Sequence, residues 1–260
     1  MRLLIAAALA LLIPPGAAAI QAADKIGKDR APGVALKALG EVQKKKGAAV
    51  SQTCELGAGQ QTTGTFQGVL RKDFVAVKGS AEIYARGKTT IVRTGDRYDQ
   101  AANLRGEEAL PVASFRNPAV LFADASRALA TAAYLDDETL EGKDCKVVSL
   151  TGDARLVKEH LQEVGEVVQR QLTGFAAAMY SGNLTSYMDE KLSSSKFTLW
   201  VGKADLLIYK VAWVLESETK PAPLVPAFKI TRKIEARFSQ WDEDVAFDIP
   251  APIKAKFGIK

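Results

Sequence analysis

The chain has few of the residues from which enzymatic sites are most often built. Its 260 residues include one histidine and two cysteines. A Ser-His-Asp or Cys-His catalytic set would have to use His160, which we expect on the solvent side of a long helix. Gly57 and Gly59 are followed by neither a lysine-serine pair nor a helical pattern, so no phosphate-cradling loop is predicted. These absences favour a binding protein over an enzyme, although a carboxylate pair assembled by the fold stays open.

Metal sites are not indicated either. Acidic residues cluster at 136–138, 189–190 and 242–244, but none of these runs has the spacing of a calcium loop. Each run is predicted to be a solvated turn. The sequence therefore predicts no metal and no cofactor.

Long apolar runs are missing beyond the N-terminus. Met1 and Arg2 form a short basic region, residues 3–13 are apolar, and residues 16–19 are small. This pattern is typical of a secretory signal peptide over residues 1–19, with cleavage there or as late as residue 23. The apolar run is shorter than the roughly 20 residues of a membrane-spanning helix, and no cysteine for lipid attachment follows it. We expect export to the periplasm without a lipid anchor or stable membrane insertion, a location that disfavours nucleic acid as a partner.

Cys54 and Cys145 are an even number of cysteines in a chain expected to be exported, where disulfides persist. We predict a disulfide bond between them, with two buried reduced thiols as the alternative. Closing so long a loop would stabilise the fold by about 4 kcal/mol in the chain-entropy model. Neither cysteine lies in a C-x-x-C motif or beside a histidine, so reactive-thiol chemistry is not expected.

The net charge of +5 is mildly basic. The one dense basic run is Lys44, Lys45 and Lys46, which we interpret as a solvated helix end; contact with anionic lipid headgroups is the alternative. The composition, 47% hydrophobic and 25% charged, is ordinary for a globular chain with a full-sized core. A single domain over residues 34–258 is the simplest interpretation.

The first half of the exported chain has the pattern of a helix followed by a strand meander. Apolar spacing predicts a helix from residue 34 towards residue 46. Strands joined by tight turns follow, and residues 57–63 are expected to form a loop by composition. The predicted extended segments are 48–56, 64–78, 81–85 and 89–93.

The second half alternates helices and strands. Residues 119–130 have helical spacing, and Pro118 stands at the first turn, where its missing donor costs nothing. Strands are predicted at 139–142 and 146–150. Residues 154–180 form the longest helical pattern, with an apolar stripe suited to covering a sheet face as a lid. The polar, serine-rich residues 181–195 are expected to form a flexible connection.

The most strongly patterned stretch is residues 197–216, which is typical of a β-hairpin around a loop at 202–205. With that loop, Trp200 lies opposite Leu207. The charged Lys210 marks the outward face, and a slip of one residue would reverse the two faces. The inward face is predicted to carry Trp200, Leu207, Tyr209, Val211, Trp213 and Leu215.

Residues 228–239 alternate apolar and polar side chains almost strictly, as a strand with one buried face does. Arg232 alone breaks the alternation. A rim position or a local bulge would explain it, and the alternative is a charge inside a lipid pocket that meets a headgroup. Residues 245–249 are predicted to add a last strand.

The order of these elements resembles the LolA/LolB-like superfamily, a periplasmic lipoprotein-carrier fold shared with mycobacterial lipid-binding lipoproteins and sigma-factor regulators of the RseB type. The resemblance implies an α+β fold, with a curved antiparallel half-barrel sheet closed by helices over a hydrophobic cavity that holds acyl chains. It rests on the export signal, the N-terminal helix, the meander, the helix after Phe-Arg-Asn-Pro at 115–118, the hairpin and residues 245–250.

We therefore expect a soluble carrier of lipid or lipoprotein acyl chains that performs no covalent chemistry. The alternative is an envelope-stress sensing or scaffolding module that binds a protein partner through the same fold. An apolar sheet face either lines a cavity or builds a sealed core, and the sequence leaves that choice open. Arg232 is the predicted headgroup contact. The predicted cavity lining is Phe66, Trp200, Leu207, Tyr209, Val211, Trp213, Phe228, Ile230, Ile234 and Phe238.

Overall fold

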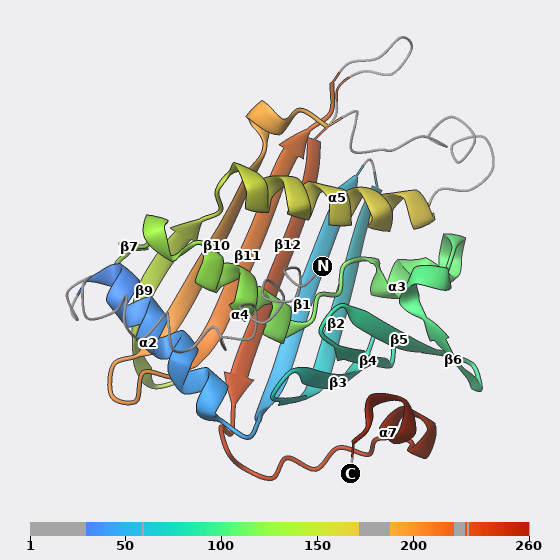
Figure 1. The fold of residues 1–260 in the computed structure, drawn as a ribbon, viewed down its shortest axis with the longest axis horizontal. Coiled ribbons are helices and arrows are strands. Elements are labelled where there is room, and N and C mark those ends of the chain that lie inside the picture. Colours follow the sequence, from blue (N-terminus) through green and yellow to red (C-terminus); the bar gives the residue numbers. More distant parts are fainter. Residues whose placement is uncertain (1–29, 59, 172–187, 221–226, 228, 260) are drawn as a thin grey trace, which may run out of the picture.

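The chain folds around one large antiparallel sheet. The computed structural model describes residues 30–58, 60–171, 188–220, 227 and 229–259. Twelve strands in these residues form the sheet: eleven follow the order β6-β5-β4-β3-β2-β1-β12-β11-β10-β9-β7, and β8 pairs with β9 off this path. Figure 1 shows the sheet open at its edges, with α2, α4 and α5 lying across one face. The predicted α+β fold, a half-barrel sheet with helices across one face, is confirmed, while the hydrophobic cavity expected beneath those helices stays a prediction.

The strands are long in the middle of the sheet and short towards its edges, which leaves little unpaired edge for another chain to join. The six longest are β1 (Ala48–Ala58), β2 (Gln60–Arg71), β9 (Lys143–Thr151), β10 (Ser194–Gly202), β11 (Ile208–Glu218) and β12 (Lys229–Ser239). The shorter ones are β3 (Phe74–Gly79), β4 (Ile83–Arg86), β5 (Thr89–Thr94), β6 (Arg97–Gln100), β7 (Ala133–Tyr134) and β8 (Glu138–Leu140).

Helices cover both faces of the sheet, but unequally. We call the face under α2 (Ala31–Lys44), α4 (Pro118–Arg127) and α5 (Ala154–Gln171) the inner face. On the outer face, α7 (Ala251–Phe257) packs Ile253 and Phe257 against Phe74, Tyr84 and Ile91. The remaining helical pieces are α3 (Leu110–Ala113), η1 (Ala101–Asn103), η2 (Gly106–Ala109), η3 (Leu129–Thr131) and η5 (Glu190–Leu192).

Local sequence explains where the inner helices begin and which side they bury. The Asn117 side chain accepts the Ala119 N–H at 3.0 Å and caps α4, with Pro118 at the first helical position. In α5 the predicted apolar stripe is buried, including Leu161 and Val164. Residues 172–180 of that predicted helix, and 181–187 of the predicted flexible connection, lie outside the described residues.

Most predicted elements are confirmed to within about three residues, and three are wrong. The single extended segment predicted at 64–78 is two antiparallel strands, β2 and β3, joined by a turn at 72–73. Residues 57–58 and 60–63 of the predicted loop are strand, because Gly57 pairs with Gln61 and Ala58 with Gln60 in the β1–β2 ladder. Strand β12 pairs with the other edge of β1, so hydrogen bonding within the sheet keeps this stretch extended although its composition favours a loop. Residues 245–249 form no strand; this connection places Ile249 on the outer face beside α7.

The predicted hairpin exists, but its predicted register is wrong. Trp200 lies opposite Lys210 and not Leu207, and the ladder shifts before Val201 pairs with Ile208. The turn is longer than the predicted loop, because Leu206 takes a left-handed φ of 58° and the Leu207 N–H is held by the Asp205 side chain. The irregularity places Trp200 and Tyr209 on the face opposite the predicted one.

The predicted disulfide is also wrong, since Cys54 and Cys145 are both free and buried. Three strands, β12, β11 and β10, lie between Cys54 on β1 and Cys145 on β9. At about 4.8 Å per strand the separation far exceeds the roughly 7 Å between Cα atoms that a disulfide spans. The structure shows the alternative, two buried reduced thiols, and burial raises the pKa of the Cys54 thiol to about 12.

Candidate functional site

Six of the ten predicted cavity residues lie together on the inner face. They are at most 3% exposed and belong to one apolar cluster: Phe66, Val211, Trp213, Ile230, Ile234 and Phe238. The covering helices touch them directly. Phe122 of α4 packs on Phe238 with ring centroids 5.0 Å apart, and His160 of α5 packs on Trp213 at 4.9 Å. In this structure the helices therefore cover the inner face in direct contact.

The other predicted lining residues lie elsewhere. Trp200 and Tyr209 pack with Cys145 on the outer face, and the Trp200 indole N–H donates to Glu138 at 2.8 Å. Leu207 is buried in the hairpin turn. Phe228 lies outside the described residues. The predicted face of Trp200 and Tyr209 is wrong, because the hairpin register shifts between Trp200 and Val201.

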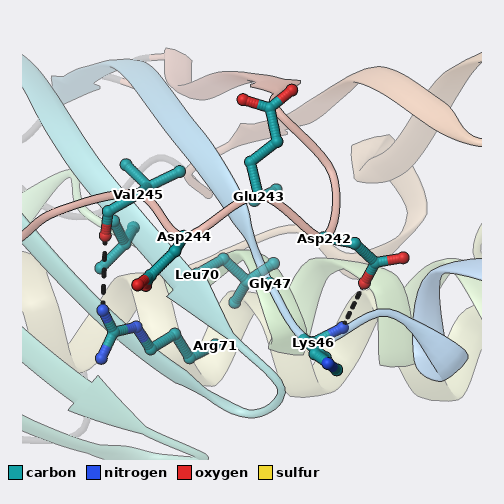
Figure 2. A pocket seen from close by; sticks show the side chains of 10 residues that line it. Lys46, Gly47, Leu70, Arg71, Asp242, Glu243, Asp244 and Val245 are labelled. Carbon is teal, nitrogen blue, oxygen red and sulfur yellow. Dashed lines mark hydrogen bonds between the residues drawn. The ribbon is translucent and has the colours of Figure 1, made fainter.

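The pocket drawn in Figure 2 is on the outer side of β1 and β2, away from the inner face. It encloses about 370 Å³ between the start of β1 and residues 242–245. Asp242 accepts the Lys46 N–H at 2.7 Å and pairs with the Lys45 ammonium at 2.8 Å, while Arg71 donates to the Val245 carbonyl at 3.3 Å. The lysine run at the end of α2 is thus partly paired within the chain. A second pocket, of about 290 Å³, lies beside the Glu141–Arg237 ion pair.

Arg232 occupies the middle of the inner face and is 1% exposed. The ladders of β12 with β1 and with β11 continue through it without a shift, so neither the rim position nor the bulge applies. Its guanidinium meets Glu163 Oε1 of α5 at 3.0 Å and donates to the Phe115 carbonyl at 2.9 Å and the Ser114 carbonyl at 3.3 Å. Arg232 therefore breaks the alternation as a buried charge whose hydrogen-bond partners come from α5 and from the segment before α4.

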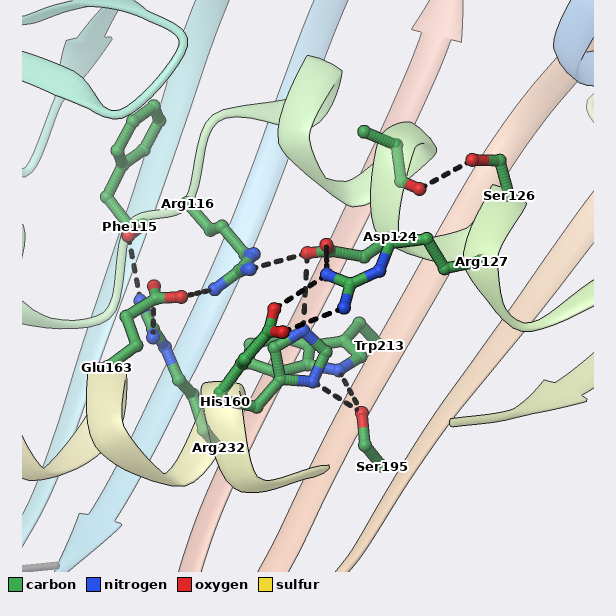
Figure 3. Close-up of polar contacts among 12 residues, drawn as sticks. Phe115, Arg116, Asp124, Ser126, Arg127, His160, Glu163, Ser195, Trp213 and Arg232 are labelled. Atoms are coloured by element: carbon green, nitrogen blue, oxygen red, sulfur yellow. Dashed lines mark hydrogen bonds and ion pairs between the residues drawn. The ribbon is translucent and has the colours of Figure 1, made fainter. Parts of the chain in front are cut away.

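Arg116 joins this arrangement from the segment that precedes α4. Figure 3 shows its guanidinium between Asp124 and Glu163. Arg116 Nη2 lies 2.5 Å from Asp124 Oδ2, and Nη1 donates to Glu163 Oε2. Both guanidinium groups also lie over the Trp213 ring, Arg116 at 4.8 Å and Arg232 at 5.4 Å from its centroid. We call Arg116, Asp124, His160, Glu163 and Arg232 the inner-face charge cluster.

His160 is 2% exposed, so its predicted solvent position is wrong. Its Nε2 lies 3.2 Å from Asp124 Oδ2 and its Nδ1 2.8 Å from Ser195 Oγ (Figure 3). Because the ionised Asp124 only accepts, Nε2 carries the proton and Nδ1 accepts the Ser195 hydroxyl. These contacts have the connectivity of a serine-hydrolase triad. Ser195, however, is completely buried and also accepts the Trp213 indole N–H at 2.9 Å, so it offers no accessible nucleophile in this state.

The electrostatics of the cluster are balanced. Although the Glu163 side chain is part exposed, its carboxylate lies against buried groups, which favours the neutral acid; the charges of Arg116 and Arg232 outweigh this effect and lower the pKa of Glu163 to about 2. Burial likewise opposes ionisation of Asp124, and the bonds from His160 and Arg116 keep its pKa below the ordinary value. Burial lowers the pKa of His160. At neutral pH two arginines therefore face two carboxylates across a neutral imidazole.

Polar atoms beside the cluster have hydrogen-bonding capacity left over. Arg116 Nε, Arg232 Nε, Ser114 Oγ and Gln52 Oε1 are buried and have no hydrogen-bond partner in the described part of the chain. Their residues are at most 6% exposed. They gather at one place, since the Gln52 amide donates to the Arg116 carbonyl at 2.8 Å and Arg232 donates to the Ser114 carbonyl. Buried orphan groups of this kind are rare in native proteins.

The sequence singled out Arg232 but missed its partners. A buried arginine requires a carboxylate, and Glu163 lies between Leu161 and Val164 in the apolar stripe of α5, which is a usable indication. No comparable sequence signal identifies Arg116 and Asp124, because their contacts depend on where α4 packs against the sheet.

Across the ranges that the structure describes, no group of three His, Cys, Asp or Glu side chains is arranged to hold a metal ion. No helix in those ranges is both long and apolar enough to span a membrane.

Comparison with known proteins identifies similar solved structures and no sequence family. No family model matches the chain, and no curated protein matches it by sequence. The lipoprotein LppX from Mycobacterium tuberculosis is 8% identical, with a TM-score of 0.44 over 84% of this chain and 97% of that chain. LprF from Mycobacterium bovis is 11% identical, with a TM-score of 0.40 over 85% of this chain and 97% of that one.

A LolA superfamily protein from Nitrosomonas europaea is 13% identical, with a TM-score of 0.26 over 86% of this chain and 96% of that one. Mycobacterial lipoproteins and a LolA superfamily protein, the kinds of protein named in the predicted resemblance, are thus among the solved structures to which this chain is similar. At these identities and TM-scores, function has to be argued from this chain's own residues.

Proposed function

We propose that this protein is a periplasmic carrier that binds acyl chains of lipids or lipoproteins on the inner face of its half-barrel and releases them without covalent chemistry. The observation that supports this most is the inner face itself. It is a broad apolar surface from β4 to β9, interrupted near its centre by the charge cluster. The signal peptide expected over residues 1–19 supports the location.

In the proposed cycle α5 leaves the sheet to admit a chain. The helix follows β9 through the short connection 152–153, and the Asp153 side chain caps it by accepting the Leu156 N–H at 2.8 Å. Its centre is held to the sheet by Glu163 and His160, which make polar contacts within an otherwise apolar interface. Breaking a buried ion pair is costly unless its charges are compensated, so we expect α5 to open when a ligand takes over these contacts.

The energetics of acyl binding are sufficient. Each buried methylene contributes about 0.8 kcal/mol, so ten of them supply about 8 kcal/mol, equivalent to micromolar affinity before costs. Displacing α5 uncovers apolar surface that the acyl chain covers again, which keeps the net cost of opening low. A ligand without a long apolar segment does not offset that cost.

The test is extraction and uptake. Protein purified from an expressing bacterium should yield co-purifying lipid by mass spectrometry, and the delipidated protein should take up a fluorescent fatty acid. Trp213→Ala on the inner face should lower uptake, and Trp200→Ala on the outer face should not, with folding of both checked by circular dichroism. An absence of both lipid and uptake would refute the carrier.

A second candidate is a sensing or scaffolding module that binds an envelope protein. It is favoured by the exposure of two large apolar residues at the sheet edge, Tyr134 at 40% and Leu135 at 50%. This module would interact with a partner without transferring lipid. Cross-linking in the envelope separates the two functions, because a carrier traps acylated cargo and a sensor traps one regulator.

A further inference from the structure

Two arginines in the middle of an apolar face need an explanation beyond packing. Arg116 and Arg232 come from different elements, the segment before α4 and strand β12, yet they converge on one carboxylate. Glu163 gives one oxygen to each of them. Paired guanidinium groups are the arrangement that proteins use to bind a carboxylate or a phosphate through several parallel hydrogen bonds.

The arginine pair has more donors than Glu163 uses. The Nε–H groups of Arg116 and Arg232 and the Ser114 hydroxyl are buried and unpartnered among the described residues, and all three belong to side chains at most 6% exposed. An anionic headgroup that is not tied to α5 can accept from these donors as well as from those that Glu163 uses. The site is therefore incompletely satisfied by the group that now occupies it.

Glu163 is the replaceable member of this arrangement. Its side chain is 37% exposed, while those of Arg116 and Arg232 are 6% and 1% exposed. It also lies on α5, the helix proposed to move, whereas the arginines lie on β12 and on the segment before α4. When α5 leaves, two buried cations keep only Asp124 as a counter-charge, and uncompensated buried charge is strongly unfavourable.

From this geometry we propose that Arg116 and Arg232 bind the anionic headgroup, a carboxylate or a phosphate, of the acyl-chain ligand. In the closed state Glu163 occupies the same site as an internal substitute for that headgroup. The proposal rests on the proposed carrier function and specifies its ligand class as an anionic amphiphile. It makes opening selective, because a neutral lipid cannot replace the charge that α5 takes away. The low pKa of Glu163 agrees with this role, since the substitute stays ionised at neutral pH.

The test compares a charged and an uncharged ligand with the same chain. Oleate, methyl oleate and inorganic phosphate are titrated into the delipidated full-length protein and into Glu163→Gln and Arg232→Met. Oleate should bind Glu163→Gln about tenfold more tightly than it binds the original protein, because a competitor for charged hydrogen bonds has been removed. Methyl oleate should gain less from this substitution, because it offers the arginines no charge. Arg232→Met should bind oleate no more tightly than methyl oleate.

The double variant Glu163→Gln/Arg232→Met is the control for folding, since it removes one charge of each sign; it should bind both oleyl ligands equally. Equal binding of oleate and methyl oleate by the original protein and by Glu163→Gln would overturn the headgroup site and leave the carrier function standing. Failure of both oleyl ligands to bind any variant would refute the carrier function itself. Phosphate that binds alone and competes with oleate would show a free-anion site and overturn the amphiphile assignment.

Discussion

Arg232→Met tests the physical description of the charge cluster. Methionine fills a similar volume over the Trp213 ring but makes none of the three hydrogen bonds of the guanidinium, to Glu163 and to the carbonyls of Ser114 and Phe115. A buried group left without its partner costs about 1–3 kcal/mol. Two effects offset part of this cost. Glu163 is part exposed and keeps its ion pair with Arg116. The variant also avoids the desolvation cost of burying a charge at position 232.

The net expectation is a destabilisation of about 2 kcal/mol, which for a domain of this size lowers the melting temperature by about 4–8 °C. Glu163→Gln alone should cost about as much, since it leaves two buried cations facing one carboxylate. The double variant should cost less than the sum by about 1–2 kcal/mol, because the two side chains are in contact. Urea unfolding of the four proteins measures this coupling. Additive effects within about 0.5 kcal/mol would refute the ion pair as drawn in Figure 3.

Three further predictions follow from the same contacts. Trp213→Ala should lower the free energy of unfolding by about 3–5 kcal/mol in urea titrations, because the completely buried indole also bonds Ser195; a loss under about 1 kcal/mol would contradict the packed inner face. Acid should destabilise the protein, because the pKa values of His160 and Glu163 are lower in the folded state, so the unfolded chain takes up protons first. Stability should therefore fall from about pH 6.5 downwards, and further from about pH 4.5 towards pH 2, and replacing His160 with Asn should flatten the first part only. Cys54 and Cys145 should react with a thiol reagent only after unfolding, and equally with and without reductant; a mass 2 Da lower before reduction would show a disulfide.

The strands and the inner helices were predictable because their signals are local. Apolar periodicity located α4 and the described part of α5, and strict alternation in β12 identified the buried face that includes Ile230, Ile234 and Phe238. The conformation of the hairpin turn could not be predicted from its residues. The left-handed Leu206 lengthens the hairpin turn, and the shift in register moves Trp200 and Tyr209 to the outer face.

The charge cluster was beyond prediction because its members are brought together only by the tertiary fold. Glu163 is 47 residues from Arg116 and 69 from Arg232 in sequence. Arg232 breaks the alternation of its strand and Glu163 lies in an apolar stripe, but only the crossing of α5 over β12 makes them partners. The same argument applies to the disulfide, since an even cysteine count says nothing of the three strands that separate Cys54 from Cys145.

The central claim, that α5 leaves the inner face to admit an acyl chain, is tested most directly by tethering the helix. Arg170 near the end of α5 donates to the Ala101 carbonyl at 3.3 Å, so Arg170→Cys and Ala101→Cys place two thiols within reach of a short bis-maleimide whose spacer contains a disulfide. The cross-linked protein should take up no fluorescent fatty acid, and reduction of the spacer should restore uptake to the level of the Arg170→Cys single variant treated identically. Uptake by the cross-linked protein at the rate of that single variant would contradict the claim.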